Sequence, residues 1–80
     1  MRERDIEKKY KKDIEEAGGM CLKLSSQYFS GLPDRLVILP GGEIYFIEFK
    51  SSTGILSMRQ RSVIRQLKEL GVRVEVVNEI

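Results

Sequence analysis

Apolar residues recur along the chain with two different periods, which divide the sequence into short elements. The first apolar residues follow a helical spacing: Ile6, Tyr10, Ile14 and Ala17. Residues three or four positions apart share one face of a helix, and glycine commonly follows the last helical turn. Because Gly18-Gly19 comes directly after this stripe, a helix is predicted over residues 3–17.

The later part of the chain alternates between apolar and polar residues, a pattern typical of strands. Strands are predicted over 20–25, 35–39 and 43–50, with a last one carrying Val72, Val74 and Val76. Pro40-Gly41-Gly42 separates the second strand from the third, which predicts a hairpin. Ser57 opens a second helix that Gly71 ends. The order of helix, three strands, helix and strand predicts an α/β fold with a mixed sheet flanked by helices.

The register of the predicted hairpin brings two carboxylates together. If the loop is the three residues 40–42, Leu39 faces Glu43, and counting back along both strands places Asp34 opposite Glu48. Directly opposed residues have β-carbons roughly 5 Å apart, and like charges there repel each other. A positive charge is therefore expected between Asp34 and Glu48.

Glu48 and Lys50 share one face of a strand that is apolar on both faces. Such a strand is usually internal to its sheet, and a buried carboxylate is costly unless it has a partner such as a metal ion. Carboxylate and backbone oxygens suit Mg²⁺ or Mn²⁺, and Lys50 could stabilise charge during phosphodiester hydrolysis. The alternative is an ordinary Glu48–Lys50 ion pair, with Asp34 as a turn residue.

Composition and charge indicate less about the function than the spacing of the carboxylates does. Hydrophobic residues make up 41% of the 80 residues, so a single folded domain over 1–80 is expected, and the net charge is only +2. Two basic clusters, Lys8 to Lys12 and Arg59 to Arg65, are typical of phosphate binding or of solvated helix faces. Cys21 has no cysteine partner, and no apolar run reaches membrane-spanning length. A buried thiol and a cytoplasmic location are expected, with no membrane association.

The motifs taken in order are more specific than any one of them. Gly31-Leu32-Pro33-Asp34, then Ile47-Glu48-Phe49-Lys50, then Gln60 resemble the PD-(D/E)xK nuclease superfamily, and within it the virus-type replication-repair nuclease (VRR-NUC) family. The resemblance covers essentially the whole chain. It implies a restriction-endonuclease-like αβββαβ core, in agreement with the order of elements derived above.

The resemblance also implies roles for individual residues. Asp34, Glu48 and the backbone carbonyl of Phe49 would bind the metal, and Lys50 would complete the motif. Related nucleases place a glutamate on the first helix, a role for which the family spacing favours Glu7, while periodicity favours Glu3.

Gln60 belongs to the family's active-site motif. The segment 57–60 is also a capping box, in which Gln60 would bond to the backbone of Ser57. The residues predicted to contact DNA are Lys23, Arg35, Arg59 and Arg61. Lys23 could equally be a solvated strand residue, and Tyr28 and Phe29 could either stack on bases or cover the core.

Together these features predict a metal-dependent, structure-selective DNA endonuclease that uses Mg²⁺ or Mn²⁺. Branched DNA such as Holliday junctions or flaps is the expected substrate, and a homodimer would offer two related sites. The family type implies viral replication or repair, in the host cytoplasm if the chain is from a phage. The alternative is a non-catalytic DNA-binding or assembly module on a nuclease fold.

Overall fold

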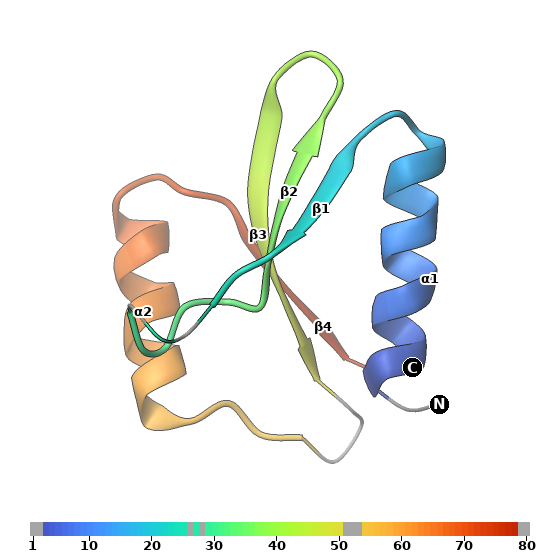
Figure 1. Ribbon diagram of the computed structural model, residues 1–80. Helices are drawn as coiled ribbons and strands as arrows, with labels where there is room; N and C mark the ends of the chain where they lie inside the picture. The colour runs from blue at the N-terminus through green and yellow to red at the C-terminus, as the bar shows by residue number, and fades with distance from the viewer. Residues whose placement is uncertain (1–2, 26, 28, 51–53, 79–80) are drawn as a thin grey trace.

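The computed structural model describes residues 3–25, 27, 29–50 and 54–78 (Figure 1). Its elements follow the predicted order: α1 (Glu3–Glu16), β1 (Met20–Lys23), β2 (Arg35–Leu39), β3 (Glu43–Lys50), α2 (Met58–Glu69) and β4 (Val74–Asn78). The strands form one sheet in the order β1-β2-β3-β4, and the two helices lie on opposite sides of it. The predicted α/β fold with a mixed sheet is confirmed.

The hairpin has the predicted register. β2 and β3 are antiparallel, with Leu39 opposite Glu43 and Arg35 opposite Ile47. Gly41 and Gly42 both have a positive φ, a conformation that glycine adopts without steric cost. Continuing the register by one residue places Asp34 opposite Glu48, as predicted.

One face of the sheet packs against α1 and forms the main core. Ile6 and Ile14 of α1 are buried against this face, and Tyr10 meets the ring of Phe49 edge-on at 5.6 Å. The sheet contributes the alternate residues Cys21, Val37, Tyr45, Ile47 and Phe49. The Cys21 thiol is therefore buried, as predicted, and burial is the main cause that raises its pKa.

The other face of the sheet lies on the α2 side. The segment from the end of β3 through α2 carries the chain to β4, which pairs in parallel with β3. Val63 and Ile64 are the buried residues of α2. Gly31 lies close to this helix, because a β-carbon built there would be 2.9 Å from a methyl carbon of Val63. The loop before β2 is thereby held against α2.

Two strand boundaries differ from the sequence prediction, and α1 ends at Glu16, one residue before the end of the predicted helix. β1 ends at Lys23 and not at Ser25, although the Leu24 amide still donates to the Asp34 carbonyl at 2.8 Å. β4 begins at Val74, because the Val72 amide caps α2 by donating to the Leu67 carbonyl. Tyr28, which could either stack on bases or cover the core, lies outside the described residues. Within the described ranges no helix is long and apolar enough to cross a membrane.

Candidate active site at the start of β2

Glu48 is the buried carboxylate around which the candidate site is built. It is 1% exposed, and no other polar or charged residue of the described chain is buried. Its carboxylate accepts a hydrogen bond from the backbone amide of Asp34, with 3.1 Å between that nitrogen and Oε1. Asp34 directly precedes β2, so the strand register brings the two acidic residues together.

The second oxygen of Glu48 is held from α2 and from β3. Gln60 donates from Nε2 to Glu48 Oε2 at 3.1 Å, and Lys50 Nζ lies 3.4 Å from the same oxygen. The Lys50 side chain is 19% exposed, so its ammonium group can reach both Glu48 and the surface. Gln60 and Lys50 therefore hold Glu48 through side-chain nitrogens on the α2 side of the sheet, and Asp34 holds it through a backbone amide.

Gln60 also caps the helix that carries it. Its Oε1 accepts from the Ser57 amide at 3.0 Å, while its own amide donates to Ser57 Oγ at 3.1 Å. These reciprocal bonds form the predicted capping box. One amide side chain therefore starts α2 and orients Glu48, so the two roles considered for Gln60 are compatible.

The surroundings of Glu48 favour its neutral form. Burial, and after it the negative charge of Asp34, raise the pKa of Glu48 to about 7, whereas Lys50 acts in the opposite direction. A raised pKa in a carboxylate pair is typical of functional sites, although ion-pair networks also produce it. A cation between the two carboxylates would stabilise both charges.

Glu7 lies on the opposite face of the sheet. Arg35 follows Asp34 in the chain and therefore points to the α1 side, where its Nε donates to Glu7 Oε1 at 2.6 Å. A second nitrogen of Arg35, Nη2, pairs with the same oxygen. The structure thus brings together Asp34, Glu48, Lys50 and Gln60, while Glu7 is engaged by Arg35.

Comparison with known proteins shows the family of this chain. The model of the VRR-NUC domain family matches residues 3–79. The chain belongs to the VRR-NUC family. A solved structure described as a VRR_NUC domain superposes with a TM-score of 0.87 at 36% identity, covering 96% of this chain and 84% of that one. The VRR-NUC fold predicted from the sequence is therefore confirmed.

A phage protein provides a second relative. The VRR-NUC chain is 43% identical over 51 residues to "Putative nuclease p44" of Acyrthosiphon pisum secondary endosymbiont phage 1. The alignment covers 64% of this chain and 55% of that protein, so it spans little more than half the relative's length. Together the comparisons support a nuclease domain.

The oxygen donors at the candidate site fit a hard divalent cation. Asp34 and Glu48 supply carboxylate oxygens, and the chain contains no histidine. Within the described ranges no group of three or more acidic, cysteine or histidine side chains is placed to hold a metal. Mg²⁺ commonly binds one or two carboxylates and keeps several waters, so this small donor set suits it.

The predicted DNA contacts fall into two groups. Lys23 and Arg35 are paired across β1 and β2 and line a pocket on the α1 side. Arg59 and Arg61 are exposed on α2, where Arg59 stacks over Phe29 at 5.4 Å and donates to Ser30 at 3.2 Å. Phe29 therefore packs against α2, and Arg61 lines a surface hollow with Met58, Ser62 and Arg65.

Arg4 was not singled out from the sequence, although it lines the same pocket as Glu7. Lys8 and Lys11 were noted only within a four-lysine cluster. The signal that would have singled out Arg4 is helical spacing, because residues 4, 8 and 11 fall on one side of a helix, whereas Lys9 lies off that stripe.

Proposed function

We propose that this chain is a divalent-metal-dependent endonuclease that cleaves branched DNA as a homodimer. The observation that carries the proposal is the buried Glu48 carboxylate, which is bonded to Asp34, Gln60 and Lys50 at one end of the central strands of a VRR-NUC domain. Burying a charge costs stability, so such a group is more readily explained by chemistry than by folding.

The proposed reaction is hydrolysis of a phosphodiester bond. Asp34, Glu48 and the Phe49 carbonyl would hold Mg²⁺ or Mn²⁺, which when bound lowers the pKa of a coordinated water and neutralises charge on the phosphate. The water loses a proton and its oxygen forms a bond to phosphorus, while the bond from phosphorus to the leaving sugar oxygen breaks and that oxygen takes up a proton from solvent. No covalent link to the protein is needed.

Lys50 and Gln60 have separable roles in this proposal. The Lys50 ammonium lies 3.4 Å from Glu48 Oε2 and can donate a hydrogen bond to the attacking water or to a phosphate oxygen. Gln60 holds the Glu48 carboxylate in one orientation through its 3.1 Å bond and is a positioning residue. Glu7 as a further ligand stays a prediction from the family resemblance.

An apolar surface supports the homodimer. Met20, Leu22 and Ile44 lie on the α2 face of the sheet towards the hairpin and are 54%, 37% and 54% exposed. Exposed apolar patches mark association surfaces, and a two-fold axis would pair this patch with itself. Light scattering after size exclusion should give a dimer for the wild type and a monomer for Ile44→Lys. A monomeric wild type would contradict the dimer.

Cleavage assays test the main proposal. Purified protein is incubated with labelled four-way junctions, flaps and linear duplex in Mg²⁺, Mn²⁺ or EDTA. We expect cleavage of the branched substrates only with metal, and its loss in Asp34→Ala and Lys50→Ala. Cleavage that survives both substitutions would contradict the site, whereas DNA binding without cleavage would favour a non-catalytic module.

A further inference from the structure

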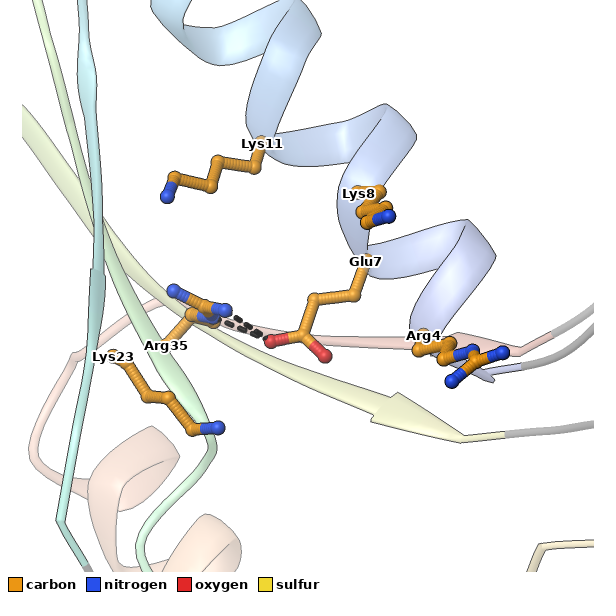
Figure 2. Close-up of a pocket in the computed structure, with 6 residues that line it drawn as sticks. All are labelled: Arg4, Glu7, Lys8, Lys11, Lys23 and Arg35. Carbon is orange, nitrogen blue, oxygen red and sulfur yellow. Dashed lines mark hydrogen bonds and ion pairs between the residues drawn. The ribbon is translucent and has the colours of Figure 1, made fainter.

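A basic pocket lies between α1 and the first two strands, across the sheet from Glu48. Figure 2 shows the side chains that line this cavity of about 210 Å³: Arg4, Glu7, Lys8, Lys11, Lys23 and Arg35. Arg35 and Glu7 are joined at its centre, with Lys11 and Lys23 above and below Arg35 in the view. The pocket is distinct from the Asp34–Glu48 site.

Helical spacing on α1 and the pairing of β1 with β2 group these residues. Arg4, Lys8 and Lys11 are three to four positions apart on α1 and so form one stripe along the helix. Lys23 lies directly opposite Arg35 in the β1–β2 pairing. The helix stripe and the strand pair come from separate parts of the sequence, so only the packing of α1 on the sheet forms the pocket.

The pocket concentrates positive charge. Its five basic residues and one glutamate give it a net charge of +4, although the whole chain carries only +2, so the remainder is net negative. Glu7 is already paired with Arg35. Among the residues described, Arg4, Lys8, Lys11 and Lys23 have no ion pair with a carboxylate. Unpaired like charges repel each other, and a bound anion would relieve that repulsion.

We propose that this pocket binds a non-scissile backbone phosphate of the nucleic acid that the enzyme cuts. The proposal rests on the proposed function for the choice of nucleic acid over an acidic protein. A phosphate group fits a cavity of this size, and lysine and arginine donors are its usual ligands. The scissile phosphate would bind at the proposed metal site of Asp34 and Glu48, so the pocket would bind a different phosphate of the same substrate.

The position of the pocket adds a geometric consequence. Asp34 and Arg35 are consecutive, with α-carbons about 3.8 Å apart, yet strand alternation directs their side chains to opposite faces. The substrate backbone therefore contacts both faces around the start of β2. A DNA strand that diverges from its duplex, as at a junction or flap, can pass around this end of the sheet more readily than a straight duplex.

α1 provides a matched pair of variants for the test. Lys8→Gln/Lys11→Gln removes two charges from the pocket, and Lys9→Gln/Lys12→Gln removes two exposed charges from the same helix outside it. Fluorescence anisotropy in EDTA would measure binding of labelled junction and duplex DNA at several salt concentrations. The pocket variant should bind about 10-fold more weakly with a shallower salt dependence, and the control should change by less than about 2-fold.

The outcomes separate this proposal from the proposed function. Equal losses in the two double variants would overturn the pocket, because diffuse helix charge would explain them. Poly-glutamate that competes as well as DNA at equal charge would overturn it in favour of an acidic protein partner. A wild type that binds DNA through the pocket but cleaves nothing would support the pocket and contradict only the nuclease reaction.

Discussion

On the α2 face of the sheet a single carboxylate is buried and held by hydrogen bonds, whereas on the α1 face several exposed cations surround a single carboxylate. Glu48 is bonded by Asp34, Gln60 and Lys50, and its pKa is raised. Glu7 is bonded by Arg35 alone among the described residues and faces solvent in part. The comparison separates a site suited to metal chemistry from a surface suited to holding phosphate.

The largest expected effect comes from removing the Glu48 charge. Glu48→Gln keeps the shape of the side chain but removes an anionic metal ligand, so the cleavage rate should fall by about 10³-fold. The melting temperature in EDTA at pH 8 should hold or rise, because a costly buried charge is gone. The matched control is Glu43→Gln, on the same strand but exposed and paired with Arg73, which should cleave normally. Equal losses in both variants would contradict the site.

The raised pKa of Glu48 predicts an unusual pH dependence of stability. The pKa of Glu48 is about 7 in the folded protein and 4.5 ordinarily, so the folded protein binds the carboxyl proton of Glu48 more tightly than the unfolded chain does. Protonated Glu48 therefore adds to the free energy of unfolding, and this contribution is fully present below about pH 4.5 and is lost as pH rises through 7. It amounts to at most about 3 kcal/mol.

Urea unfolding in EDTA at pH 5, 6, 7 and 8 measures this contribution as the difference between wild type and Glu48→Gln. Asp34→Asn should reduce the effect, because the negative charge of Asp34 helps to raise the pKa of Glu48. Parallel stability curves for wild type and Glu48→Gln would show that Glu48 does not titrate in this window.

Substitutions at Gln60 separate helix capping from the orientation of Glu48. Gln60→Glu keeps an acceptor for the Ser57 amide but replaces the donor to Glu48 with a third carboxylate. We expect cleavage to fall about 10- to 100-fold with little loss of stability. Ser57→Ala should do the reverse, losing about 1 kcal/mol of stability while it cleaves normally. Urea unfolding and cleavage rates of the two variants provide the comparison.

The smallest expected effect is at Glu7. Glu7→Gln releases Arg35 and removes a negative charge from the basic pocket, so the KM for DNA should fall about 2- to 3-fold. The Mg²⁺ concentration that gives half-maximal cleavage should change by less than about 2-fold. A rise of about 10-fold or more would instead identify Glu7 as a metal ligand and weaken the contrast between the two faces.

Local patterns in the sequence predicted most of the fold. Helical spacing and strand alternation are local properties, so the order of elements and the mixed sheet could be derived from them. The turn at 40–42 fixed the hairpin register, and that register places Asp34 beside Glu48. The capping box at 57–60 was local as well, since both of its bonds span three residues.

What the tertiary structure decided are the contacts between separate elements. Only the packing of α2 on the sheet shows that Gln60 donates to Glu48 while it caps its own helix. Only the packing of α1 on the other face pairs Glu7 with Arg35 and adds Arg4 to the basic pocket. Periodicity determines which side of an element a residue occupies, but the residue it meets there depends on how elements distant in the sequence pack together.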